Sequence, residues 1–150
     1  MLVSEILRIK GTTLYTTASD APVVEAVKVM VQLDIGSLVV MDKGRMTGMV
    51  TFAEVLAALA ARGGSLGDLT IGAIVVREPP TATPDLDVMD LRRMMLERHA
   101  RYVPVMDGVT LQGVISFHDV AKAVYEEQSF ENRMLKSYIK DWPEAEEGRV

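Results

Sequence analysis

Apolar and polar positions along the first half of the chain follow helix spacing and strand spacing in turn. Within residues 23–33, apolar side chains recur three or four positions apart and predict an amphipathic helix: Val23, Ala26, Val27, Met30 and Leu33. Two β-prone runs follow, Ser37–Met41 and Met46–Val50, and the Asp-Lys-Gly-Arg turn between them predicts a hairpin. A short strand over Thr13–Thr17 and a closing helix over Phe52–Arg62 complete the predicted unit.

The second half of the chain repeats this pattern at a constant offset. Similar residues return without a gap: Thr16, Asp20, Val23, Met30, Gly48, Phe52 and Val55 recur as Thr81, Asp85, Val88, Met95, Gly113, Phe117 and Val120. The predicted elements recur as well, as a strand at Pro80–Ala82, a helix with Val88, Leu91, Met94 and Met95 on one face, a hairpin of Tyr102–Met106 and Leu111–Ile115, and a helix over Phe117–Gln128. A constant offset of this length indicates an internal duplication.

Each copy reads β-α-β-β-α and is too small to bury a good core alone. Its sheet has an open face that needs a partner. We therefore predict an α/β (α+β) fold of tandem β-α-β-β-α repeats, packed sheet to sheet with pseudo-twofold symmetry, plus a C-terminal helix. The predicted units are residues 1–62 for the first repeat, 63–70 for the linker and start of the second, 71–127 for the second repeat, and 128–150 for a C-terminal helix and tail.

Capping side chains and prolines mark the start of the first long helix in each copy. Ser19–Pro22 and Thr83–Asp85 combine both signals and predict N-caps there. Beyond residue 128, apolar residues from Phe130 to Ile139 predict a helix that packs on the domain or on a second subunit. We expect the acidic stretch from Pro143 to Val150 to be a frayed tail.

The amino-acid composition limits which classes of protein this chain can belong to. The chain has 150 residues, 49% of them apolar, and no cysteine, which excludes disulfides and thiolate metal sites. A formal net charge of −5 argues against general nucleic-acid binding. No apolar run approaches the roughly 18 residues that a membrane helix needs, and the start of the chain does not resemble a signal peptide. We expect a cytoplasmic protein that binds neither membrane nor metal.

Each copy carries a Gly-apolar-apolar-hydroxyl-any-any-carboxylate motif where its last strand meets its last helix. The motif runs from Gly48 to Glu54 and from Gly113 to Asp119. A hydroxyl followed three residues later by an acid is a capping box, which is a purely structural interpretation. The same geometry suits a nucleotide, because a helix N-terminus favours phosphate and the carboxylate can accept from ribose hydroxyls. The glycine would let a ligand approach the backbone. The motif alone leaves both interpretations open.

The doubled unit, with this motif closing each copy, resembles the CBS domain pair, or Bateman module, over about residues 1–125. Further matches are Thr16–Asp20 and Thr81–Asp85 before the first long helix and Tyr102–Asp107 after it, and the tail from Glu126 is similar to stand-alone bacterial members. The resemblance implies a regulatory module that needs no cofactor. It implies a ligand between the repeats, which would be AMP, ADP or ATP, and less often NAD or S-adenosylmethionine. It also implies a homodimer.

The resemblance places the main nucleotide site between the two copies. Asp119 would bind the ribose hydroxyls, with Ser116 and His118 near ribose and phosphate. Lys10 and Arg101 would face phosphate, and Tyr15 would stack on adenine. The rest of the expected lining comes from both copies: Gly11, Leu14, Ile35, Gly36, Tyr102 and Val114.

A second, degenerate site is implied at the other crevice, where Glu54 stands in place of the family's aspartate. Its extra methylene moves the carboxylate by about 1 Å, which matters for paired hydrogen bonds. Val75 and Val76 also occupy the place of Lys10 and Gly11. We therefore expect weak, different or no binding there. The expected lining is Ser37, Met49, Thr51, Glu54, Val75, Val76 and Pro79.

These features favour a sensor in which a bound nucleotide changes the angle between the copies and an unknown effector protein reads the change in trans. The alternative is a non-binding structural or interaction dimer whose motifs serve only as helix caps. An enzyme is the third possibility. The chain has no evident nucleophile–base pair, metal set or Walker loop, so we expect no catalysis.

Overall fold

The structure is a computed structural model that describes residues 1–11 and 13–140. After an N-terminal helix, α1 (Val3–Lys10), the first copy consists of β1 (Thr16–Thr17), α2 (Val23–Leu33), β2 (Ser37–Asp42), β3 (Arg45–Thr51) and α3 (Phe52–Ala61). The second copy consists of a 3-10 turn, η1 (Ile71–Ala73), then α4 (Val88–Glu97), β4 (Tyr102–Asp107), β5 (Thr110–Ser116) and α5 (Phe117–Lys140). The long helices and the hairpins begin at equivalent positions in both copies, which confirms the duplication.

Each copy forms a small sheet around its hairpin. In the first copy β1 pairs parallel to β2, and β2 pairs antiparallel to β3. In the second copy β4 pairs antiparallel to β5, and both hairpins carry an irregularity at the same place, after Val40 and after Val105.

The strand expected at Pro80–Ala82 is reduced to one parallel bridge from Ala82 to Val105. In the first copy the N–H of Val39 donates to the carbonyl of Tyr15. Pro104 stands at the position of Val39 and has no N–H to donate to Pro80.

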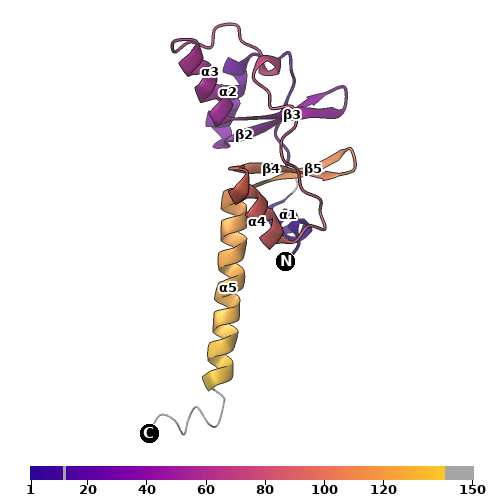
Figure 1. The fold of residues 1–150 in the computed structure, drawn as a ribbon, viewed down its shortest axis with the longest axis vertical. Helices are drawn as coiled ribbons and strands as arrows, with labels where there is room; N and C mark the ends of the chain where they lie inside the picture. Colours follow the sequence, from indigo (N-terminus) through magenta and orange to yellow (C-terminus); the bar gives the residue numbers. More distant parts are fainter. Residues whose placement is uncertain (12, 141–150) are drawn as a thin grey trace.

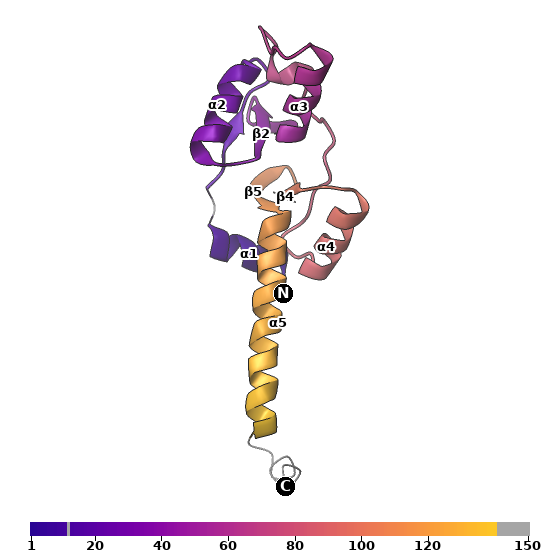
Figure 2. The ribbon, with the colours of Figure 1, turned by 90° about the vertical axis from the view of Figure 1, so that its left-hand side faces the viewer.

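The two sheets lie in the middle of the molecule with helices on the outside, α2 and α3 on one side and α1 and α4 on the other (Figures 1 and 2). This arrangement confirms the predicted packing of sheet to sheet. Buried hydrophobic residues form two clusters, one between each sheet and its own helices. Val39 and Met49 are also buried but belong to neither cluster, because they lie on the opposite face of the first sheet from Leu38, Val40 and Val50.

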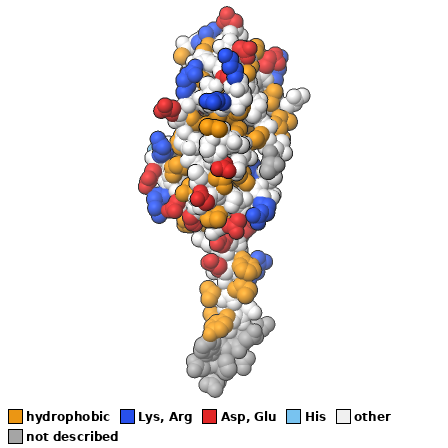
Figure 3. Space-filling view, turned by 90° about the vertical axis from the view of Figure 1, so that its right-hand side faces the viewer, with side chains coloured by type: hydrophobic (Ala, Val, Ile, Leu, Met, Phe, Trp, Pro, Cys, Tyr) orange, Lys and Arg blue, Asp and Glu red, His pale blue; other side chains and the backbone are white. Residues whose placement is uncertain are grey.

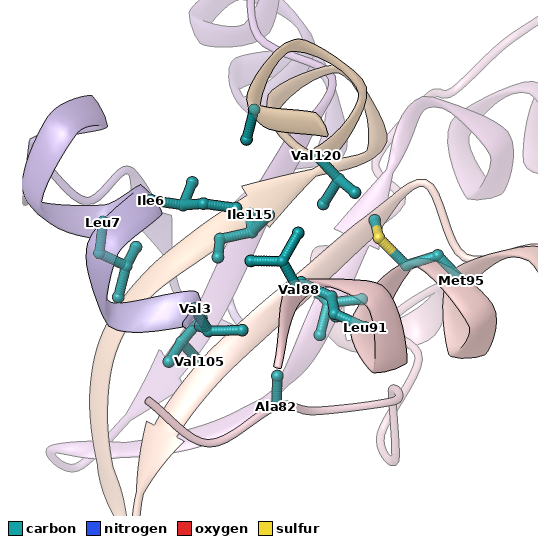
Figure 4. Close-up of a cluster of buried hydrophobic side chains, with 12 residues drawn as sticks. Val3, Ile6, Leu7, Ala82, Val88, Leu91, Met95, Val105, Ile115 and Val120 are labelled. Atoms are coloured by element: carbon teal, nitrogen blue, oxygen red, sulfur yellow. The ribbon is translucent and has the colours of Figure 1, made fainter. Parts of the chain in front are cut away.

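The N-terminal helix α1 packs on the second copy, although it directly precedes the first copy in the sequence. Val3, Ile6 and Leu7 of α1 belong to the second copy's core, where they meet α4, β4, β5 and the start of α5 (Figure 4). In exchange, Ile71 of η1 is buried in the first copy's core. Each core is thus completed by a segment that precedes the other copy's elements, and this exchange ties the two halves together.

The first helix begins inside its predicted range, with Pro22 at the N-cap position, whereas the N-cap of the second is Asp87, two residues beyond Thr83–Asp85. The prediction of capping side chains is wrong, because neither of these side chains caps its helix. The exchanged segments provide the acceptors instead: the N–H of Val23 donates to the carbonyl of Leu69, and that of Val88 donates to Met1, both at 2.9 Å.

The last helix is one continuous element over 117–140, where the sequence predicted a helix to Gln128 and a separate one after it. No glycine or proline interrupts this stretch, so nothing local stops the helix. Its far half projects beyond the domain, so the expectation that it packs on the domain is wrong (Figure 1). The predicted tail from Pro143 lies outside the described residues. In the described part of the chain, no helix has both the length and the apolarity needed to cross a bilayer.

Candidate functional site

A cavity of about 520 Å³ lies where the two copies meet. The first half of the chain contributes the end of α1, the segment after it and the turn between α2 and β2. The second copy contributes the start of β4 and the junction of β5 with α5. The residues that line the cavity are Lys10, Gly11, Thr13, Leu14, Tyr15, Asp34, Ile35, Gly36, Ser37, Arg101, Tyr102, Val114, Ser116, Phe117 and His118.

The capping box at the start of α5 forms one wall of this cavity. The N–H of Ser116 donates to Asp119 Oδ2 at 2.8 Å, and the N–H of Asp119 donates to Ser116 Oγ at 3.0 Å. The structural interpretation of the motif is therefore correct for this copy. It leaves the Ser116 side chain at the cavity wall, where it can also meet a ligand.

Lys10 joins α1 to this box across the two halves of the chain. Its ammonium donates to Asp119 Oδ2 at 2.5 Å and to the carbonyl of Val114 at 2.8 Å. Burial raises the pKa of Asp119, but the hydrogen bonds from Lys10 and Ser116 and the charge of Lys10 lower it more, so the net pKa lies below its ordinary value. Asp119 is therefore a carboxylate at neutral pH.

Asp119 is the one residue of the predicted main site that does not line the cavity directly. Its side chain is 19% exposed, whereas that of Lys10 is 38% exposed. The other predicted residues, eleven in number, are all among the lining residues. Lys10 thus stands between the cavity and the carboxylate that was expected to hold the ribose.

Arg101 and Tyr102 enter the cavity at the start of β4, beside the first copy's Phe52. The Arg101 guanidinium lies 5.4 Å from the centre of the Phe52 ring, in a cation–π contact. The Tyr102 ring meets Phe52 edge-on at 6.4 Å, and burial raises the pKa of the Tyr102 hydroxyl, partly opposed by the charge of Arg101. A β-carbon at Gly36 would overlap the Tyr102 hydroxyl, so the bare backbone of Gly36 gives this ring its place.

Three cavity residues were missed by the sequence analysis: Thr13, Asp34 and Phe117. Phe117 follows Ser116 in the motif, and Asp34 precedes the expected Ile35 and Gly36. Asp34 also has a left-handed backbone with φ of 52°, the same value as His99 at the equivalent position of the second copy. Extending each predicted stretch by one residue would have found both of these.

The family model of the CBS domain matches this chain twice, over residues 3–61 and 71–126. The chain belongs to the CBS domain family. It is 30% identical over 147 residues to the CBS domain-containing protein CBSX3, mitochondrial, of Arabidopsis thaliana, a match that covers 91% of this chain and 71% of that protein.

Solved structures of CBS proteins share this fold. The CBS-domain containing protein ATU1752 from Agrobacterium tumefaciens superposes with a TM-score of 0.78 at 27% identity, covering 82% of this chain and 98% of that one. The CBS domain pair of protein MJ0100, solved in complex with 5′-methylthioadenosine and S-adenosyl-L-methionine, has a TM-score of 0.74 at 26% identity and covers 85% and 98% of the two chains.

A second cavity of about 260 Å³ lies at the other junction of the CBS repeats. Met49, Thr51, Glu54, Val76 and Pro79 line it as expected. Arg101 and Tyr102, predicted only for the larger cavity, also line this one. The sequence analysis missed the remaining lining residues: Ala53, Pro80, Arg98, His99 and Ala100. Glu54 accepts from the N–H of Thr51 at 2.9 Å, so this CBS repeat has its own capping box.

Two residues expected in the second site lie elsewhere. Ser37 lines the larger cavity, because it continues the 34–36 turn that forms that wall. Val75 packs against the first repeat's core, where it lies next to the bridge between Met49 and Val76.

The motif glycines do not serve ligand approach, as the sequence analysis expected. A β-carbon at Gly48 would overlap the carbonyl of Val76, and one at Gly113 would lie 2.7 Å from Leu7 Cδ2. Each glycine therefore leaves room for another segment of this chain. Gly48 makes room for the Val76 backbone, and Gly113 makes room for the Leu7 side chain of α1.

Proposed function

We propose that this CBS domain pair is a regulatory module that binds an adenosine nucleotide, AMP, ADP or ATP, in the cavity between its repeats. The observation that carries the proposal is the cavity itself, which brings the cations Lys10 and Arg101 together with the Ser116–Asp119 box from opposite ends of the chain. Its volume of about 520 Å³ is within the range of small-molecule sites, roughly 300–1,000 Å³.

Each part of an adenosine nucleotide has a suitable group in or next to the cavity. Arg101 and Lys10 provide positive charge for phosphate, and Asp119, behind Lys10, provides an acceptor for ribose hydroxyls. Tyr15, Leu14 and Ile35 offer an apolar wall for the base. The MJ0100 domain pair, with its two adenosine-containing ligands, supports the ligand class. NAD and S-adenosylmethionine are the less favoured candidates.

Thermal unfolding and calorimetry with AMP, ADP, ATP, NAD and S-adenosylmethionine test the proposal. A ligand at 100 times its dissociation constant should stabilise the protein by about 2.7 kcal/mol. Arg101→Ala should reduce this effect for the phosphate-bearing ligands. Arg93→Ala is the matched control, because Arg93 pairs with Asp90 on the exposed side of α4.

The competing function is a structural or interaction module that binds no ligand. The observation in its favour is that the hydroxyl and the carboxylate of each motif cap a helix in both repeats. Absence of a shift with every adenosine compound, in a protein that unfolds cooperatively, would favour this function over ours. A turnover assay with ATP would separately expose an enzymatic activity, which we do not expect.

We further propose that the module forms a homodimer in the cytoplasm and acts on an effector protein in trans. Side chains along the projecting half of α5 support self-association. Phe130, Met134, Leu135, Tyr138 and Ile139 are each more than half exposed, and hydrophobic side chains gather on this extension in Figure 3. Contiguous apolar surface of this kind marks interaction sites.

A further inference from the structure

Lys10 lies between the cavity and the Asp119 carboxylate, because it lines the cavity and donates to Asp119 Oδ2. All hydrogen bonds that described residues donate to the Asp119 carboxylate end on Oδ2, one from Lys10 and one from the N–H of Ser116. The capping bond belongs to the helix and remains when a ligand enters. The Lys10 bond comes from the cavity side, because Lys10 lines the cavity and Asp119 does not. Ligand hydroxyls that approach Asp119 Oδ2 from the cavity therefore compete with Lys10.

Displacing Lys10 leaves its ammonium without its carboxylate partner. A charge-assisted hydrogen bond of this kind is worth more than a neutral one, by about a factor of two. Ribose hydroxyls compensate Asp119, but they do nothing for the cation. A ligand that also carries phosphate offers Lys10 a new anionic partner inside the same cavity, whereas an uncharged nucleoside offers none.

The end of α1 is suited to this exchange of partners. Lys10 is the last residue of the helix. Gly11 follows with a φ of 97°, a backbone conformation that glycine adopts easily and other residues rarely adopt. The apolar residues of α1 remain anchored in the second repeat's core. The Lys10 side chain can therefore turn within the cavity without moving the helix that carries it.

We propose that Lys10 makes the site selective for adenosine ligands that carry phosphate. It competes with ribose for Asp119 when the ligand is a nucleoside and binds the phosphate when the ligand is a nucleotide. This inference rests on the proposed function, and it adds a specificity role that a simple phosphate contact would not have. A simple contact would strengthen AMP binding only, whereas a competitor also weakens adenosine binding.

Calorimetric titration of the full chain with AMP and with adenosine separates these effects, because the two ligands differ only in the phosphate. We expect the wild type to bind AMP at least about tenfold more tightly, the ratio that corresponds to about 1.4 kcal/mol. In Lys10→Met, AMP binding should weaken while adenosine binding becomes stronger. Lys10→Arg should restore the preference, and Lys28→Met, in an exposed pair with Glu25, should leave both affinities unchanged.

Two results would overturn the inference while leaving the proposed function in place. One is equal binding of AMP and adenosine by the wild type. The other is a Lys10→Met variant that weakens both ligands alike, as loss of a merely structural ion pair would. Failure of the wild type to bind any adenosine compound would instead overturn the proposed function, and this inference with it.

Discussion

Asp42 and Asp107 stand at equivalent positions of the two copies, yet only the first holds a loop in place. Ser19 and Thr47 donate side-chain hydrogen bonds to Asp42, and the N–H of Ser19 adds another at 3.0 Å. These bonds lower the pKa of Asp42 from 3.8 to about 2. In the second copy Pro84 takes the place of Ser19, so neither the hydroxyl nor the N–H is available.

Asp42→Asn should therefore destabilise the protein at neutral pH, because the ionised carboxylate accepts three bonds in the folded state. The folded pKa is the lower one, so this stability is fully present above the unfolded value of about 3.9. It is lost as the pH falls toward 2. Urea unfolding of wild type and variant from pH 7 downward measures the difference.

The difference between wild type and Asp42→Asn should shrink below pH 4. Asp107→Asn is the control, because Asp107 makes no side-chain hydrogen bond with the described part of the chain. A constant difference between wild type and Asp42→Asn from pH 7 to pH 2 would contradict the assigned role of the ionised carboxylate.

Gly36 and Tyr102 form a second pair that can be tested at the residue scale. Gly36→Ala should destabilise the protein by about 1–3 kcal/mol, the typical cost of overpacking, because the new methyl overlaps the Tyr102 hydroxyl. Tyr102→Ser introduces the residue that the first copy has at this position, Ser37. The cost of Gly36→Ala should largely disappear in that background. Additive effects in this double-mutant cycle would show that the ring is not the obstacle.

At the scale of elements, α1 illustrates how packing assigns a segment to a repeat. Its sequence position suggests the first copy, but its apolar face is buried in the second. Figure 2 shows α1 beside α5 and away from α2 and α3 of the first copy. The 3-10 turn η1 makes the equivalent contact in the opposite direction.

Two isoleucines of α1 provide a matched test of this assignment. Ile6 is 4% exposed and lies in the second repeat's core, whereas Ile9 is 73% exposed. Ile6→Ala should lower the free energy of unfolding by about 2–5 kcal/mol, and Ile9→Ala should change it by no more than about 0.5 kcal/mol. Chemical denaturation of both variants measures this. Equal effects would mean that α1 is only loosely attached.

At the scale of the whole molecule, packing within one protein chain does not explain the length of α5. Its domain-proximal turns bury Val120 and Ala123, but its far half contributes apolar side chains to no core in the described structure. A helix that long gains little from the domain alone, since packing of an apolar face provides most helix stability. A second copy would provide the missing contacts.

Analytical ultracentrifugation should accordingly show a dimer for the wild type. A double substitution of Met134 and Leu135 by Glu should give a monomer, because both side chains lie on the exposed apolar stripe. Ser129→Glu, on the other side of the same helix, adds charge without removing apolar area and should remain dimeric. A wild type that sediments as a monomer, or a double variant that stays dimeric, would contradict the role of α5.

Much of the site could be read from the sequence, because the repeat positions the same motif twice and the family resemblance names its neighbours. Lys10, Tyr15, Arg101 and Ser116 were expected together and share one cavity. The errors concern residues that lie between the two copies and could line either cavity. Ser37 was assigned to the smaller cavity, but it lines the larger one, and only the path of the chain between the sheets distinguishes these positions.

Local periodicity and turn chemistry by themselves determined the duplicated unit, its helices and strands, and both capping boxes, because these depend on residues a few positions apart. The tertiary structure alone decided that α1 completes the second core, that the two sheets keep separate cores, and that Lys10 holds Asp119. These last two residues are 109 positions apart. Their contact exists because packing of the α1 apolar face brings Lys10 to the start of α5, and no local pattern encodes that distance.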